Sequence, residues 1–234
     1  MPKRGVSLKK PKVIVNVFSS VDGRITTSPD RNVMEWTAAG IDGDANTITH
    51  RLYDDLDCDA MLSGSESLMV WGSHWVELEK PIYVPKKSKS YIVFDGRGRI
   101  NWQQTKDLVV VTREDVPGSY IEQLREKKIT YILAGRGNHI DIRLALHHLY
   151  EMGFRTIGLS GGGSINGAFL RAGVIDEISL VLAPLVIGGR TTPTTFDCED
   201  LLSVEGAASL ELLQSKPLGN KGAVWLHYRV GGKK

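Results

Sequence analysis

The fold is decided by residues 159–170, which read Leu159-Ser160-Gly161-Gly162-Gly163-Ser164-Ile165-Asn166-Gly167-Ala168-Phe169-Leu170. A β-branched run precedes the glycines, and apolar residues at helical spacing (Ile165, Phe169 and Leu170) follow them. Glycine lets a ligand approach the main chain closely, and the start of a helix offers unpaired N–H groups and partial positive charge to an anion. The stretch predicts either a site for the pyrophosphate of a dinucleotide or a tight strand-to-helix turn with nothing bound.

The composition is that of a globular domain, with 41% hydrophobic and 24% charged residues in a chain of 234. A net charge of +2, with no basic run interleaved with aromatic residues, gives no indication of a nucleic-acid partner. No apolar stretch approaches the roughly 18 residues that a membrane helix needs, and the first residues lack the apolar core of a signal peptide. We therefore expect a cytoplasmic protein with no membrane partner.

Predicted strands and helices alternate along most of the chain, which indicates a parallel or mixed sheet covered on both faces. A predicted hairpin, residues 210–214 and 223–230, closes the chain. We expect one domain at residues 12–230 between a basic tail (1–11) and a C-terminal tail (231–234). The expected strands are 13–18, 58–62, 90–95, 107–112, 129–134, 155–159 and 176–184, and the expected helices are 42–56, 68–70, 117–128, 141–152 and a segment beginning near 164; residues 26–39 and 71–85 are expected to be irregular.

Polar residues follow several of the predicted strands. Asn16 interrupts the first apolar strand, and its amide either ties down neighbouring backbone or points into a site. The Asp22-Gly23 turn after this strand lies where open α/β sheets bind ligands, although a loop without chemistry is the alternative. Arg97 and Arg99 suit the 2′-phosphate of a dinucleotide, or are exposed turn residues.

The sequence lacks the residue patterns that several other kinds of site require. His147 and His148 are adjacent, so on a helix they point about 100° apart and cannot share one metal. The serine-hydrolase elbow and the P-loop lysine are absent. Cys58 and Cys198 share no metal or redox spacing and are expected to be unpaired thiols, with one distant disulfide as the alternative. The glycine run also departs from the usual dinucleotide fingerprint, because it does not follow the first strand.

The chain resembles the pyrimidine reductase domain of riboflavin biosynthesis, within the dihydrofolate-reductase-like superfamily. The resemblance covers residues 12–230 and rests on Asn16 with residues 20–25, and on residues 59–67, 91–95, 160–166, 173–177 and 183–189. It implies a three-layer α/β fold with a mixed, mostly parallel sheet, helices on both faces and a C-terminal antiparallel hairpin. It also implies a homodimer with NADPH as the cofactor and no metal.

The implied reaction is hydride transfer to the ribosyl carbon of a ribosylamino-pyrimidine phosphate. Two departures from the family pattern keep a second hypothesis open, a related reductase of another small carbonyl, imine or heterocycle. Ser160 stands where family members have Glu, and residues 70–78 replace a segment that carries a phosphate-binding Arg. A third hypothesis is a nucleotide-binding protein without turnover.

The resemblance also implies the site residues. A cis peptide is expected at Gly161–Gly162 or Gly162–Gly163, and the proton donor is Asp22 or water. The implied catalytic residues are Asn16, Ser20 and Asp22; the implied cofactor-binding residues are Trp36, Thr37, Gly64, Ser67, Arg97, Gly161, Gly162, Gly163, Ser164, Ile165 and Asn166; the implied substrate-binding residues are Ser160 and Pro184.

Overall fold

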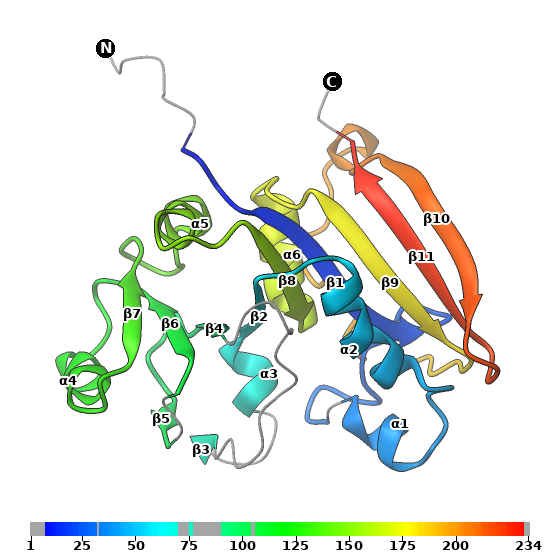
Figure 1. The fold of residues 1–234 in the computed structure, drawn as a ribbon, viewed down its shortest axis with the longest axis horizontal. Coiled ribbons are helices and arrows are strands. Elements are labelled where there is room, and N and C mark those ends of the chain that lie inside the picture. The colour runs from blue at the N-terminus through cyan, green and yellow to red at the C-terminus, as the bar shows by residue number, and fades with distance from the viewer. Residues whose placement is uncertain (1–7, 32, 70–74, 77–89, 104–105, 232–234) are drawn as a thin grey trace.

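The computed structural model describes residues 8–31, 33–69, 75–76, 90–103 and 106–231. Within these residues nine strands form one sheet in the order β10-β11-β9-β1-β8-β2-β4-β6-β7 (Figure 1). Neighbours from β9 to β7 pair in parallel, and β11 pairs antiparallel with both β9 and β10. The strands are β1 (Lys12–Ser20), β2 (Ala60–Gly64), β4 (Ser90–Phe94), β6 (Leu108–Thr112), β7 (Thr130–Leu133), β8 (Thr156–Gly161), β9 (Glu177–Ala183), β10 (Leu210–Leu218) and β11 (Ala223–Val230).

Helices cover both faces of the sheet and complete three layers. Helices α5 and α6 pack against one face, where Leu146 and Phe169 join the alternate apolar residues of β1 and β2. Helices α2, α3 and α4 cover the opposite face, together with α1. The helices are α1 (Met34–Ala38), α2 (Ala45–Asp55), α3 (Ser65–Met69), α4 (Gly118–Glu126), α5 (Ile142–Glu151) and α6 (Gly163–Arg171), with a 3₁₀ turn η1 at Val204–Gly206.

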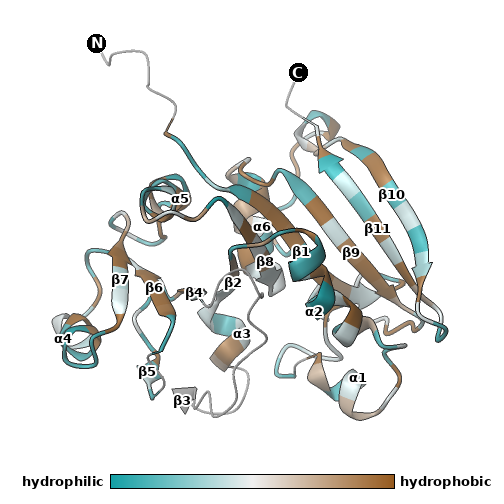
Figure 2. Ribbon diagram, viewed as in Figure 1, coloured by the Kyte–Doolittle hydropathy of each residue, from teal (hydrophilic) through white to brown (hydrophobic). Residues whose placement is uncertain are grey.

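The apolar runs of the central strands explain this arrangement. Every residue of β2 and β6 is buried, as expected for parallel strands with helices on both sides. Figure 2 shows hydrophobic residues concentrated along β1 and β8 in the middle of the sheet, whereas β10 at the sheet edge mixes both kinds. The predicted three-layer α/β fold with a mixed, mostly parallel sheet and a C-terminal hairpin is confirmed.

Some element boundaries differ from the prediction. The loop expected at 26–39 contains the short helix α1, and the strand expected at 155–159 continues to Gly161. Part of the region expected to be irregular, Trp75–Val76, forms strand β3, which pairs in parallel with β5 (Asn101–Trp102). The rest of residues 71–85 and the outermost residues of both predicted tails lie outside the described residues. No helix in the described part of the chain is long and apolar enough to cross a membrane.

Candidate functional site

The candidate site lies where four neighbouring parallel strands, β9, β1, β8 and β2, have their carboxyl ends. Ser20 at the end of β1 is in register with Ala183 at the end of β9. Gly161 at the end of β8 is in register with Ser63 near the end of β2. Since parallel strands end at the same sheet edge, the polar and glycine residues that follow them meet there, as open α/β sheets require of a ligand site.

The glycine run forms a turn that is joined to the next strand-to-helix junction. The peptide bond Gly161–Gly162 is cis, which confirms the first of the two expected positions. Gly161 has a φ of +100°, a conformation that favours glycine. The N–H of Gly162 donates to Ser67 Oγ at 2.7 Å, so α3 holds the turn that begins α6.

The start of α6 offers donors to a ligand. Within the described residues, the N–H groups of Gly163, Ser164 and Ile165 have no protein acceptor, as expected in the first turn of a helix. Asn166 is completely buried; its Nδ2 donates to the carbonyl of Thr195 at 2.9 Å, while its Oδ1 has no partner. This cluster can bind an anion without a lysine or arginine.

A segment that sequence reasoning missed packs over this turn. We call residues 187–199, in the connection from β9 to β10, the strap. A Cβ on Gly163 would collide with Asp197 Oδ2 and the carbonyl oxygen of Thr194, and a Cβ on Gly167 would collide with the backbone of Asp197. The close approach of the strap therefore explains why these two positions are glycine. The sequence alone could not show this reason, because the contact is known only from the fold.

Ser20 and Asp22 attach the other end of the strap. Ser20 Oγ donates to Asp22 Oδ1 at 2.6 Å, and the carboxylate also accepts the N–H groups of Ile187 at 3.1 Å and Gly188 at 2.7 Å. The Ser20 hydroxyl, with these N–H groups, lowers the pKa of Asp22 from 3.8 to about 2. The hydrogen bonds thus favour the ionised form of Asp22 in the ligand-free protein, and the choice between Asp22 and water as proton donor stays a prediction.

Asn16 takes the first of its two expected roles and ties the backbone. Its Nδ2 donates to the carbonyl of Thr49 at 2.9 Å, and its Oδ1 accepts the hydroxyl of Ser179 at 2.9 Å. The Ser179 hydroxyl also accepts the indole N–H of Trp225. With 1% of its surface exposed and a hydrogen bond at each end of its amide, Asn16 links β1 to α2 and β9, and its expected catalytic role stays a prediction.

Trp36 and Thr37 are placed by α1 rather than by a flexible flap. Trp36 is 1% exposed and lies edge-on to Phe18, with ring centroids 6.0 Å apart. Thr37 Oγ1 donates to Asp42 Oδ2 at 3.1 Å, just ahead of α2. In this structure the indole belongs to the core beside the end of β1, and its expected contact with a cofactor stays a prediction.

Two arginines gather beside α3. Arg99 forms a short ion pair with Glu66, and Arg97 Nη1 lies 3.7 Å from the same carboxylate. Glu66 directly precedes Ser67, which holds the glycine turn. The guanidinium groups are thus placed next to the anion-binding cluster, along the sheet edge toward β4.

The two residues expected to contact substrate lie at different strands of this edge. Ser160 is an extra residue where β8 shifts register against β2, and its hydroxyl donates to the carbonyl of Leu62 at 3.1 Å. Pro184 follows β9 and lies next to Gly43 and Gly222. Gly64 ends β2 against the side chain of Ile165. The structure therefore places Ser160 near the glycine turn and Pro184 toward α2 and the hairpin.

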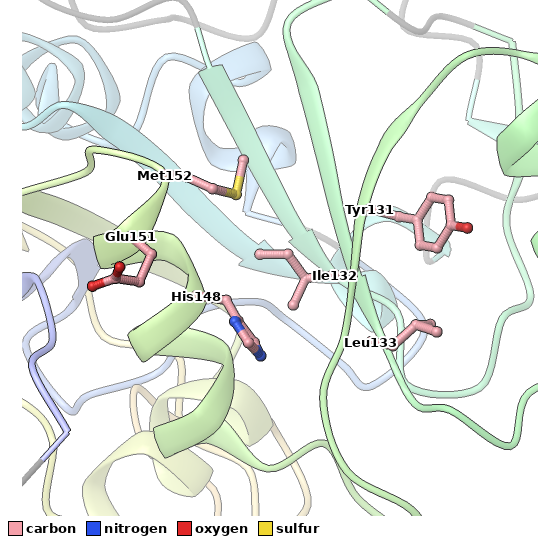
Figure 3. Close-up of a pocket in the computed structure, with 6 residues that line it drawn as sticks. All are labelled: Tyr131, Ile132, Leu133, His148, Glu151 and Met152. Atoms are coloured by element: carbon pink, nitrogen blue, oxygen red, sulfur yellow. The ribbon is translucent and has the colours of Figure 1, made fainter. Parts of the chain in front are cut away.

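One surface hollow lies elsewhere. It has a volume of about 500 Å³ and is lined by residues of β7 and α5 at the far edge of the sheet. In Figure 3 Ile132 points toward α5, whereas Tyr131 and Leu133 point to the other side of the strand. The hollow is a shallow surface feature beside the edge strand β7, and none of the site residues described above lines it.

The His, Cys, Asp and Glu side chains of the described residues bear on whether a metal site or a thiol site exists. Among the described residues, no group of three or more His, Cys, Asp or Glu side chains is placed to hold a metal ion. Cys58 and Cys198 are both free thiols, as predicted, and burial raises the pKa of Cys58 to about 12.

We predict that the Asp22 carboxyl titrates well below its ordinary range. The hydrogen bonds stabilise the ionised form, so their contribution to folding is complete above the unfolded pKa near 3.8 and is lost as pH falls through about 2. An NMR titration of the side-chain carboxyl carbon of Asp22 measures this directly. A midpoint at or above 3.8 would contradict the described contacts.

Comparison with known proteins agrees with the fold. A relative from Methanothermobacter thermautotrophicus, named 2,5-diamino-6-ribosylamino-4(3H)-pyrimidinone 5′-phosphate reductase, is 26% identical over 216 residues, covering 90% of this chain and 94% of the relative. A pyrimidine reductase-like protein from Corynebacterium diphtheriae shares the fold with a TM-score of 0.65 at 15% identity, over 95% of this chain and 92% of that one. RibD from Acinetobacter baumannii does so with a TM-score of 0.69 at 18% identity, over 95% of this chain and 58% of that one. The family model of the RibD C-terminal domain matches residues 11–224, and the chain belongs to this family.

Proposed function

We propose that this protein is an NADPH-dependent reductase that transfers a hydride to the ribosyl carbon of a ribosylamino-pyrimidine phosphate in riboflavin biosynthesis. The observation that carries the proposal is the free N–H cluster at the start of α6, set beside the ends of β1 and β8. Relatives from Methanothermobacter thermautotrophicus and Aquifex aeolicus, each 26% identical and each matched over more than nine tenths of its length, carry the name of this phosphate reductase.

The residues present fit a nicotinamide dinucleotide. The N–H groups of Gly163, Ser164 and Ile165 would bind its pyrophosphate, because they are donors without a protein acceptor. Ser67 would keep the turn in place by accepting the Gly162 N–H. When bound, this cofactor supplies the hydride, and the protein supplies alignment and electrostatics.

Arg97 and Arg99 support NADPH rather than NADH. Both guanidinium groups face one carboxylate, that of Glu66, in the way that they would face a phosphate. Arginine binds phosphate through paired N–H groups. The 2′-phosphate of NADPH would therefore compete with Glu66 for these two side chains.

The protein's own part in the reaction is to position the reactants. Reduction adds a hydride to carbon and a proton to the atom that becomes the amine. Since the Asp22 carboxylate accepts three hydrogen bonds that favour its ionised form, we propose an ordered water as the proton donor. Holding the reacting atoms about 3–3.5 Å apart supplies much of the rate enhancement in such sites.

One observation favours a second candidate, a reductase of another small carbonyl, imine or heterocycle on the same fold. The Ser160 hydroxyl is committed to the carbonyl of Leu62, so this position offers no carboxylate to an aminopyrimidine edge. The other departure, residues 70–78, lies almost wholly outside the described residues.

Turnover tests the function directly. We expect loss of NADPH absorbance when the purified protein is mixed with the ribosylamino-pyrimidine phosphate, and formation of the ribitylamino product by mass spectrometry. NADPH binding without oxidation by this substrate, but with oxidation by another carbonyl or imine, would favour the second candidate. Absence of binding by both NADPH and NADH would overturn the reductase assignment.

We predict that Arg97→Ala and Arg99→Ala weaken NADPH binding about tenfold each and leave NADH binding unchanged, because each removes a charge-assisted hydrogen bond to an exposed phosphate. Dissociation constants from tryptophan fluorescence measure the effect. Arg125→Ala is the matched control, since its guanidinium bonds Tyr131 away from this cluster. Equal losses for NADPH and NADH would refute recognition of the 2′-phosphate.

We infer that the protein is a homodimer that pairs through β10. Leu210 and Leu212 of this edge strand are 47% and 53% exposed, and Leu202 beyond η1 is fully exposed. An antiparallel pair of β10 strands can place Glu211 of one copy opposite Lys216 of the other, which is favourable in charge. Such an unpaired apolar edge is otherwise prone to aggregation.

Leu212→Glu is expected to convert the dimer to a monomer, because two copies of the introduced carboxylate would enter the apolar contact. Light scattering after size exclusion measures the mass. Met152→Glu, at a residue that is 46% exposed on the far edge, is the control and should leave the mass unchanged. A wild-type mass equal to one chain would contradict the inference.

A further inference from the structure

We propose that Asp22 is a positioning residue that acts through the strap, residues 187–199, to hold the glycine turn at the start of α6 in its ligand-binding geometry. The proposal rests on the proposed function for the identity of the ligand, but the mechanical link can be tested without one. In this proposal Asp22 makes no contact with the reacting atoms. Its role is to support the residues that surround them.

The near end of the strap depends on one carboxylate. Asp22 accepts the N–H groups of Ile187 and Gly188, and the Ser20 hydroxyl fixes its rotamer from the end of β1. Ser20 is itself completely buried and accepts the N–H of Arg24 at 2.9 Å. The attachment point is therefore rigid, and the strap leaves it in a defined direction.

The middle of the strap is joined to the loop that follows Asp22. Arg24 Nη1 donates to the carbonyl of Thr192 at 2.6 Å, and the N–H of Ile25 donates to the carbonyl of Pro193 at 3.1 Å. The N–H of Thr195 returns a bond to the carbonyl of Gly23 at 3.0 Å. These bonds run in both directions, so the strap and residues 22–25 form one unit.

The far end of the strap is hydrogen-bonded to α6. The carbonyl of Thr195 accepts Asn166 Nδ2 at 2.9 Å, and the N–H of Asp197 donates to the carbonyl of Gly163 at 3.0 Å. Asp197 Oδ1 accepts both the N–H and the hydroxyl of Thr194, which folds the strap back against the helix. Gly163 and Gly167 have no Cβ, and this allows the close approach.

The start of α6 needs this external support. Its N-cap residue is Gly162, which has no side chain to cap the helix, and two further glycines adjoin it. Besides the strap, the turn is held by the bond from Gly162 to Ser67, by the pairing of Gly161 with Ser63, and by the packing of Ile165 against Gly64. Loss of the hydrogen bonds between Asp22 and the strap should therefore also disturb the N–H groups at the start of α6 that would bind the pyrophosphate.

Amide hydrogen exchange of the ligand-free protein tests the link. In Asp22→Asn we expect faster exchange, by about tenfold or more, at Ile187 and Gly188 and also at the distant amides of Thr195 and Asp197, as loss of a charge-assisted tie predicts. Asp115→Asn is the matched control, because Asp115 likewise accepts a glycine N–H, that of Gly137 at 3.0 Å, but after β6 and β7 at the far end of the strand order. Acceleration confined to Ile187 and Gly188 would overturn the proposal.

A double-mutant cycle on NADPH affinity tests the consequence. We expect Asp22→Asn and Asp197→Asn each to raise the dissociation constant about tenfold and the double variant to add little, since both act through one strap. Additive losses would overturn the proposal, because they would mean separate contacts. If Asp22→Asn does not fold, Arg24→Met removes the bond to Thr192 and serves in its place. A wild-type protein that binds no nicotinamide cofactor defeats the proposed function alone, while the exchange experiment still judges the strap.

Discussion

The parallel pairing of β1 with β8 on one side and β9 on the other is the constraint on which the site depends. Ser20 of β1 is in register with Ala183 of β9, and β8 ends at Gly161, two residues after the Val15–Leu159 pair, so the three residues lie toward one edge although they are far apart in the chain. The pairing is enforced by apolar side chains on both faces, and the helices that supply the covering layers also begin or end at this edge. A site built on strand ends is held as rigidly as the sheet, and loops form only its outer side.

The glycines of residues 161–167 serve two purposes, and the sequence alone does not show which glycine serves which purpose. Gly161 adopts a positive φ within the turn, whereas Gly163 and Gly167 leave room for another part of the protein. Close packing of backbone against backbone is as common a reason for glycine as ligand binding. Conversely, the donors that remain open at the helix start come from any residue type, and their availability follows from helix geometry alone.

Much of the fold could be predicted from the sequence because apolar runs and helical spacing are local. The strands of the sheet, the hairpin and the junction at the glycine run were all predicted in this way, and errors fell on short elements such as α1, where five residues carry too little periodicity. The strap could not be predicted, because its contacts join residues about 165 apart, such as Asp22 and Gly188. The role of Asn16 likewise depends on partners, Thr49 and Ser179, that only the tertiary structure brings near.

The irregularity at the end of β8 has a consequence for how this site can change. Ser160 has no counterpart in β2, and the pairing resumes beyond it with Gly161 opposite Ser63. A deletion of this single residue would restore a regular ladder and favour the sheet. The glycines that follow would keep their pairing with β2, but the hydroxyl that bonds the carbonyl of Leu62 would be lost. The bulge therefore adds one polar side chain at the carboxyl end of β8 for which a regular strand has no position.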